Sequence, residues 1–167
     1  MSSPVKEQEK DGVWRKKAVL VGIIVGALAA GIGVFYYMTS KETLASSSRL
    51  DEFSTNIDYK VEQYRYRSRA IITFGSSPNS SLVCNLSGIK IDKILEQRWL
   101  ANGRAIYLNL SINPDSSTTP VPARLIFDFQ RGELFLSSPV SLWRTNSSSS
   151  RWMNDAEFDG VLARFGR

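Results

Sequence analysis

An uninterrupted apolar stretch near the start of this chain dominates its sequence. It reads AVLVGIIVGALAAGIGVFYYM from Ala18 to Met38 and contains no charged side chain and no Asn, Gln, Ser, Thr or Pro. At about 1.5 Å of rise per residue, a helix of this length measures about 30 Å, which matches the hydrocarbon thickness of a bilayer. Because lipid offers no partners to backbone polar groups, a continuous helix is the allowed form. The sequence predicts one transmembrane helix over 18–38.

Basic residues are distributed unevenly around this stretch. Those that precede it are Lys6, Lys10, Arg15, Lys16 and Lys17. Over a comparable distance after it, Lys41 and Arg49 are balanced by Glu42, Asp51 and Glu52. Lys and Arg close to a membrane helix stay on the cytoplasmic side. We therefore expect a cytoplasmic tail over 1–17 and an exported C-terminal domain. Trp14, Tyr36 and Tyr37 lie where aromatic side chains collect at the headgroup level.

A cleaved signal peptide is the alternative to a retained anchor. Arg15 to Lys17 form a basic region, Ala18 to Gly26 an apolar one, and Ala27-Leu28-Ala29 has the small-residue pattern of a cleavage site. Cleavage after Ala29 would leave AGIGVFYYM as an apolar N-terminus in water, and nothing in the sequence is built to cover it. The sequence therefore favours a signal anchor that is retained.

Three small residues fall on one face of the predicted span. Gly22, Gly26 and Ala30 are four residues apart, a spacing that lets two membrane helices approach closely. They are candidate contacts for a homodimer or a partner helix, although Gly and Ala are common in membrane helices in any case. The span carries no ionisable residue, whereas ion paths and proton relays need such groups inside the bilayer. We expect this helix to act as an anchor.

The remainder of the chain has the size of one domain. Subtracting the tail and the span leaves about 125 residues, enough for a single hydrophobic core. We expect a juxtamembrane linker over 39–48, which is small and polar, and one exported domain over 49–167. The net charge of +5 is dispersed along the chain. This charge is weak support for an anionic partner, and the predicted topology argues against nucleic acid.

The composition excludes several kinds of catalysis. The chain has no histidine and a single cysteine, Cys84. Ser-His-Asp and Cys-His catalysis, histidine-based zinc sites and intrachain disulfides are therefore excluded. Most carboxylates of the exported domain fall at predicted helix starts or strand faces, where capping and solvation explain them. We expect no cofactor, no metal and no enzymatic activity, and we keep a histidine-independent enzyme as an alternative.

The compartment is open between a bacterial periplasm and an endoplasmic reticulum lumen. In a lumen, Asn-x-Ser sequons would be glycosylation acceptors at Asn79, Asn85, Asn109 and Asn146. Asn85 and Asn109, however, lie in predicted strands, and a serine-rich chain produces such matches by chance. We favour a bacterial inner membrane with the domain facing the periplasm.

The first segment of the domain has a helical spacing of apolar residues. Leu50, Phe53, Ile57, Val61 and Tyr64 recur every three or four positions, which predicts an amphipathic helix from Arg49 to Arg67. A strand that begins near Tyr59 is the alternative. The end of this segment combines cations with aromatic rings, and its candidate binding residues are Tyr64, Arg65, Tyr66, Arg67 and Arg69. This patch could hold lipid headgroups, an anionic glycan or an acidic protein surface. A solvated helix end would show the same residues.

The rest of the domain alternates apolar runs with turn residues. We expect a hairpin over 70–86 and a helix over 91–101, with Asn102-Gly103 either ending that helix or forming a hairpin turn. A core strand follows over 106–112, and a hairpin over 125–136 turns at Gly132. Asn154 and Glu157 predict a capping box for a final helix. The predicted fold is α+β: one transmembrane helix, then a small, mostly antiparallel sheet domain with flanking helices.

These features favour binding over chemistry. Our first expectation is a single-pass scaffold or assembly subunit of a cell-envelope complex, acting through protein contacts of the exported domain and the membrane helix. Its expected partners are other membrane or envelope proteins and the lipid bilayer. The alternative is a membrane-tethered binding module for lipid, glycan or peptide.

Overall fold

The computed structural model describes residues 5–50, 55–76, 80–115, 117, 119–138, 143–145 and 150–166. Residues 1–40 and 41–167 form two compact units. The first unit contains α1 (Val5–Thr39), in which Lys16–Thr39 is long and apolar enough to cross a membrane. None of this segment is buried by the chain itself, as expected of a helix whose apolar surface faces lipid. The span predicted over 18–38 lies within it.

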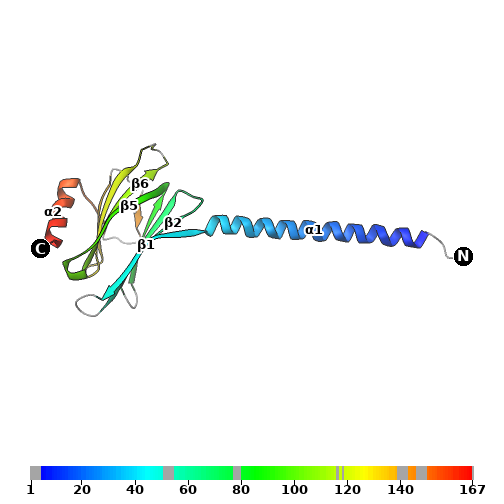
Figure 1. The fold of residues 1–167 in the computed structure, drawn as a ribbon, viewed down its shortest axis with the longest axis horizontal. Coiled ribbons are helices and arrows are strands. Elements are labelled where there is room, and N and C mark those ends of the chain that lie inside the picture. The colour runs from blue at the N-terminus through cyan, green and yellow to red at the C-terminus, as the bar shows by residue number, and fades with distance from the viewer. Residues whose placement is uncertain are drawn as a thin grey trace. The chain divides into compact units, whose positions relative to one another are not determined.

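The second unit is a domain of two sheets (Figure 1). The first sheet has the order β1-β2-β3-β4-β9 and is antiparallel throughout. Its strands are β1 (Lys41–Leu50), β2 (Asn56–Tyr64), β3 (Arg69–Ser76), β4 (Ser80–Ser87) and β9 (Trp143–Thr145). The second sheet has the order β10-β8-β7-β6-β5 and is antiparallel except for β10 beside β8. Its strands are β5 (Ile89–Leu100), β6 (Ala105–Pro114), β7 (Val121–Asp128), β8 (Glu133–Ser137) and β10 (Ser150–Trp152), and η1 (Ala101–Gly103) joins β5 to β6.

The main core lies between the inner faces of the two sheets. Strand residues alternate between faces, so every second side chain of β2, β3 and β4 points inward. The rings of Phe74 from the first sheet and Phe127 from the second stack with centroids 4.6 Å apart. Cys84 is fully buried in the same core. Apolar contact between these faces holds the sheets together.

A smaller cluster covers the outer face of the second sheet. The helix α2 (Asp155–Phe165) buries Phe158 and Val161 against that face. The sheet residues beneath it are Leu100, Ala105, Tyr107, Ile126 and Phe135. Asn154 and Glu157 form a reciprocal capping box at the start of α2, as predicted from the sequence. The predicted fold class is confirmed: an apolar N-terminal helix is followed by an α+β domain.

Polar side chains join the two sheets where β2 approaches β5. The Tyr59 hydroxyl donates a hydrogen bond to Oε1 of Gln97 at 2.6 Å. The Gln63 side-chain oxygen accepts a hydrogen bond from the backbone N–H of Ile91, and its amide nitrogen donates to Glu42. These bonds give buried polar groups the partners that burial requires.

The helix predicted from Arg49 to Arg67 is wrong. β1 continues to Leu50 and β2 starts at Asn56, whereas residues 51–54 lie outside the described residues. Ile57, Tyr59 and Val61 point into the core with the period of a strand. The alternative strand was correct in type, although it begins three residues before Tyr59. The segment 41–48, expected to belong to a linker, is part of β1.

The helix predicted over 91–101 is also wrong, because residues 91–100 belong to β5 and Ala101 begins η1. Two irregularities in its pairing with β6 fall between Ile91 and Lys93 and between Ile94 and Glu96. Each bulge inserts one residue, so successive core-facing positions move from two to three residues apart. Ile91 and Ile94 thereby acquire the spacing of a helix. Asn102-Gly103 lies in the connection between paired strands, which confirms the hairpin alternative.

Candidate functional site

An open groove of about 910 Å³ runs beside α2 on the outer side of the second sheet. Four separate segments line it: the η1 corner, the β7–β8 turn, β10 and one face of α2. Its charged lining residues are Arg104, Asp128, Arg131, Glu133, Arg151, Glu157 and Arg164. Its apolar lining includes Phe135, Met153, Val161 and Phe165. The groove therefore combines an apolar surface with a rim of guanidinium and carboxylate groups.

Gly160 keeps the helical side of this groove open. It lines the groove, and a Cβ placed on it would meet no atom within 4 Å. Glycine inside a helix lowers helix stability by about 1 kcal/mol relative to alanine. Its position on the groove face leaves room that any larger side chain would occupy.

An ion pair between a buried aspartate and a partly exposed arginine lines the groove. Asp128 is 1 % exposed, and its carboxylate accepts hydrogen bonds from Nη2 of Arg104 at 3.0 Å and from Nε at 3.4 Å. The same carboxylate also accepts the backbone N–H groups of Gln130 and Arg131, which fixes the β7–β8 turn. Arg104 lies 5.8 Å from the ring centroid of Phe165 at the end of α2. Arg104 and Asp128 are thus engaged within the fold.

The remaining charges of the groove divide into paired and unpaired groups. Arg151 lies 3.7 Å from Glu133, and Glu157 accepts the backbone N–H of Asn154 in the capping box. Arg131 and Arg164, in contrast, have no carboxylate partner among the described residues. Both side chains are exposed. Two guanidinium groups in this groove are therefore available to an anionic ligand.

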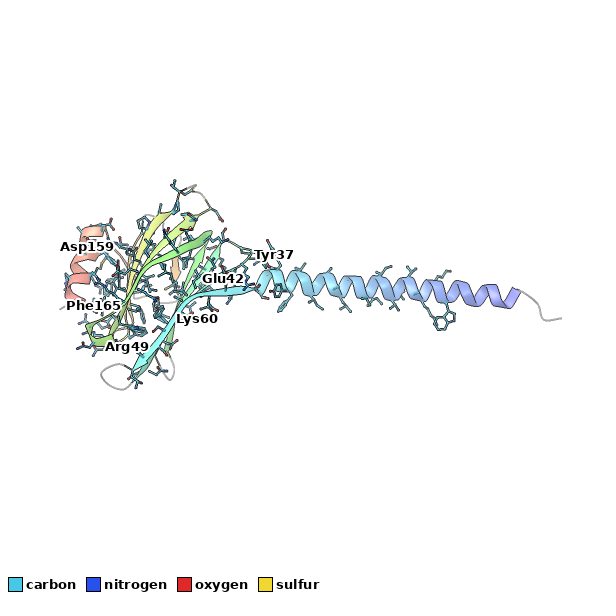
Figure 2. All side chains as sticks on the ribbon, in the orientation of Figure 1. Tyr37, Glu42, Arg49, Lys60, Asp159 and Phe165 are labelled. Atoms are coloured by element: carbon cyan, nitrogen blue, oxygen red, sulfur yellow. The ribbon has the colours of Figure 1, made fainter. Side chains whose placement is uncertain are left out.

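A second charge cluster holds the N-terminal end of α2 on the sheet. Arg124 donates to Asp155 and to Asp159, each at 2.6 Å, and its guanidinium lies 4.8 Å from the ring centroid of Phe158. The Ser137 hydroxyl donates to the same Asp155 oxygen at 2.6 Å. These bonds lower the pKa of Asp155, with the Ser137 hydrogen bond as the largest cause and Arg124 as the next. Figure 2 shows Asp159 and Phe165 at different heights along α2, so this cluster and the Arg104 corner fix two separate parts of the helix.

The structure brings the predicted patch into a hairpin turn. Tyr64 ends β2, Arg69 begins β3, and Arg65, Tyr66 and Arg67 lie between them. The reading of this patch as a helix end is wrong, because no helix is present there. Its role in binding stays a prediction. Nζ of Lys41, on β1, lies 5.1 Å from the centroid of the Tyr64 ring, and the guanidinium of Arg69 lies 5.3 Å from it.

The predicted helix-contact residues lie in α1. Gly22 and Gly26 would each accept a Cβ without meeting another atom of the chain within 4 Å, and Ala30 is exposed. No described part of the chain therefore covers the small-residue face. Whether a second helix covers it stays a prediction.

The groove could not be anticipated from the sequence, because its lining is assembled from distant segments. The sequence patterns singled out neither Arg131 nor Arg164 as a binding residue. One signal was available: Gly160 interrupts a capped amphipathic helix at an exposed position. Among the described residues, no group of three or more Cys, Asp or Glu side chains could hold a metal ion.

Comparison of the chain with protein families, with curated proteins and with solved structures found no match. Any functional conclusion therefore depends on the geometry of the sites described above.

Proposed function

We propose that this protein is a single-pass, membrane-anchored assembly subunit whose domain holds a segment of another protein in the groove beside α2. The main support for this proposal is that Arg131 and Arg164 line a groove with an apolar surface. Neither arginine has a carboxylate partner in the described part of the chain. A peptide that combines acidic and apolar side chains is complementary to such a site. Its carboxylates would pair with guanidinium groups, and its apolar side chains would cover Phe135 and Val161.

Binding is a better account of this groove than catalysis. Among the described residues, the groove lining contains no Ser, Thr, Cys, Lys or Tyr that could serve as a nucleophile. Two of its three carboxylates, Asp128 and Glu133, pair with arginines, and Glu157 caps α2. A general base needs a carboxylate that is free to take a proton. These observations support a binding role.

Peptide selection would test the proposal. The full chain, reconstituted in nanodiscs, is used to select from a random peptide library, and the affinities of selected peptides are measured by fluorescence anisotropy. We expect the selected sequences to be rich in Asp, Glu and apolar residues. Arg131→Glu combined with Arg164→Glu should weaken their binding at least tenfold, because each reversal replaces an attraction with a repulsion.

Gly160 supplies a matched pair of variants. Gly160→Trp should fill the groove and abolish binding, whereas Gly160→Ala adds one methyl group and should leave the affinity within about twofold. Selected peptides that bind the Gly160→Trp variant as tightly as the natural chain would show that the groove is not the site. Failure to select any acidic peptide would also contradict the proposal.

The proposed location is a bacterial inner membrane, with the N-terminus in the cytoplasm and the domain in the periplasm. It is supported by the excess of Lys and Arg before the apolar segment and by the length of Lys16–Thr39. Protease added to spheroplasts should remove the domain while leaving α1 in the membrane. A domain that is digested only after lysis would reverse the orientation.

Association through α1 is a separate proposal. The uncovered face of Gly22, Gly26 and Ala30 supports close packing of two helices, as in a homodimer. Replacing both glycines with leucine should reduce crosslinking between copies in membranes. Unchanged crosslinking would place the contact elsewhere.

A further inference from the structure

The hairpin turn at Tyr64–Arg69 is joined to the membrane helix by a very short path. α1 ends at Thr39, and β1 begins at Lys41, so one residue separates them. Lys41 is the register partner of Tyr64 on β2. Consecutive Cα atoms are about 3.8 Å apart, and paired strands lie about 5 Å apart. Chain length alone therefore keeps Tyr64 within about 13 Å of the helix end, whatever the orientation of the domain.

Four cations gather around this turn. Lys41 and Arg69 both lie over the ring of Tyr64, and Arg69 also donates to Asn85 at 3.3 Å. Arg65 and Arg67 have no carboxylate partner among the described residues. Glu42, the nearest acid along β1, is hydrogen-bonded to Gln63. Lys41, Arg65, Arg67 and Arg69 outnumber this acid, so the turn has a net positive charge.

Aromatic groups accompany these cations. Tyr66 at the tip of the turn is 47 % exposed. Tyrosine and tryptophan concentrate at the membrane–water interface, where the ring contacts the acyl boundary and the hydroxyl remains hydrated. Arginine binds phosphate through paired N–H groups, and its aliphatic stem can lie along apolar surface. The arginine and tyrosine side chains of the turn are therefore suited to bind in the headgroup layer of a membrane.

The turn itself is held in shape by backbone hydrogen bonds. The N–H of Arg69 donates to the carbonyl of Arg67 at 2.8 Å, and the N–H of Ile89 donates to the carbonyl of Ser68 at 3.2 Å. The second bond ties the turn to the first residue of β5. The arginine side chains therefore project from a fixed backbone, which lowers the entropy lost when they bind.

We propose that the Tyr64–Arg69 turn, together with Lys41, binds the headgroups of anionic phospholipids in the leaflet next to the domain. The short path from α1 keeps Tyr64 within about 13 Å of the helix end. Arg65 and Arg67, which have no carboxylate partner among the described residues, supply the charge. This site would hold one end of the domain against the bilayer. It requires that α1 span the membrane and is independent of the groove beside α2.

Hydrogen exchange of the full chain in nanodiscs tests this proposal. One sample contains phosphatidylcholine alone, and the other contains one third phosphatidylglycerol. We expect exchange in the peptide that covers 64–69 to slow at least about fivefold with the anionic lipid, and 0.5 M NaCl should remove the difference. Equal exchange in the two lipid mixtures would overturn the proposal.

Three double variants provide the comparison. Arg65→Glu with Arg67→Glu should abolish the lipid-dependent protection, and Arg65→Gln with Arg67→Gln should reduce it. Arg131→Glu with Arg164→Glu changes the net charge equally but lies in the groove, so it should leave the protection intact. Protection that survives reversal at the turn, or that the groove variant also removes, would overturn the proposal. Exchange of the β3 core amides shows whether each variant is folded.

Discussion

At the scale of single residues, Arg124 connects α2 to the sheet on which it lies. Its two outer nitrogens reach Asp155 and Asp159, and its planar group covers Phe158. Only 20 % of its side chain is exposed, although both acids are largely in solvent. Ion pairs in such positions contribute modestly, and a cation over a ring adds to them. The side chain acts as a clamp on the helix.

Arg124→Met should lower the free energy of unfolding by about 1 kcal/mol, because the apolar stem is retained while both ion pairs are lost. Chemical denaturation of the reconstituted chain would measure this. Arg98→Met is the matched control, since Arg98 also pairs with an acid and lies over Tyr107 but is half exposed. We expect the control to lower the free energy of unfolding by less than about 0.5 kcal/mol. Equal losses would show that Arg124 has no special role.

The same cluster predicts a dependence on pH. The pKa of Asp155 is lowered in the folded state from an ordinary value of 3.8. A lowered pKa contributes stability that is present above pH 3.8 and is lost as the pH falls through the folded value. Hydrogen exchange of α2 should therefore accelerate below about pH 4, relative to the β3 amides. Asp155→Asn should remove most of this acid response, and an unchanged response would assign it to other carboxylates.

Cys84 provides a probe of the core. Burial raises the pKa of its thiol to about 12, so almost no reactive thiolate exists near neutral pH. We expect iodoacetamide at pH 8 to leave the folded chain unmodified for hours and to alkylate it completely in denaturant. Mass spectrometry detects the added group. Rapid alkylation without denaturant would mean that the two sheets separate readily.

At the scale of elements, α2 depends on its first turn. The Asn154 side chain accepts the N–H of Glu157, and the Glu157 side chain accepts the N–H of Asn154. Asn154→Ala should cost about 1 kcal/mol and speed hydrogen exchange along α2. Asn154→Asp keeps an acceptor and should retain most of the stability. If both variants lose stability equally, the cap is not responsible.

Elements also show what could be predicted from the sequence. The hairpins of β3–β4 and β7–β8 and the capped helix α2 were predicted correctly, because turn residues and caps act over a few positions. β5 was mistaken for a helix because its bulges, which depend on the partner strand β6, change the period of core-facing residues. β2 was mistaken for a helix because Leu50 and Tyr64 continued a helical spacing by coincidence. The residues near one position in the sequence do not show which distant strand will pair with it.

At the scale of the whole molecule, the domain begins at Lys41 and not at Arg49. β1 pairs with β2 along its length, and Leu44 and Ala45 pack against the main core. A fragment of residues 41–167 should fold, whereas one of residues 49–167 should lose at least about 2 kcal/mol of stability. Thermal unfolding monitored by circular dichroism would compare them. Equal melting temperatures would show that β1 is dispensable.

The groove beside α2 is a property of the whole molecule and could not be predicted from the sequence. Arg104, Arg131, Arg151 and Arg164 come from four segments that meet only when both sheets and α2 are assembled. The Tyr64–Arg69 patch, in contrast, is contiguous in sequence and was identified from its composition, although its conformation was not. Contiguous sites are visible in one sequence, whereas assembled ones require the tertiary structure.

The position of β1 has a mechanical consequence. Glu42 and Arg49 lie toward opposite ends of this strand (Figure 2), and the chain enters it directly from the helix. Arg49, toward the far end of the strand, lies beside Gly103 of η1, and its guanidinium is 5.7 Å from the ring centroid of Trp99. Tension applied through the helix and resisted by a ligand near η1 would run along the strand, perpendicular to its hydrogen bonds with β2. Those bonds would be loaded together in shear instead of being unzipped in succession, so the attachment would withstand a larger force before it ruptured.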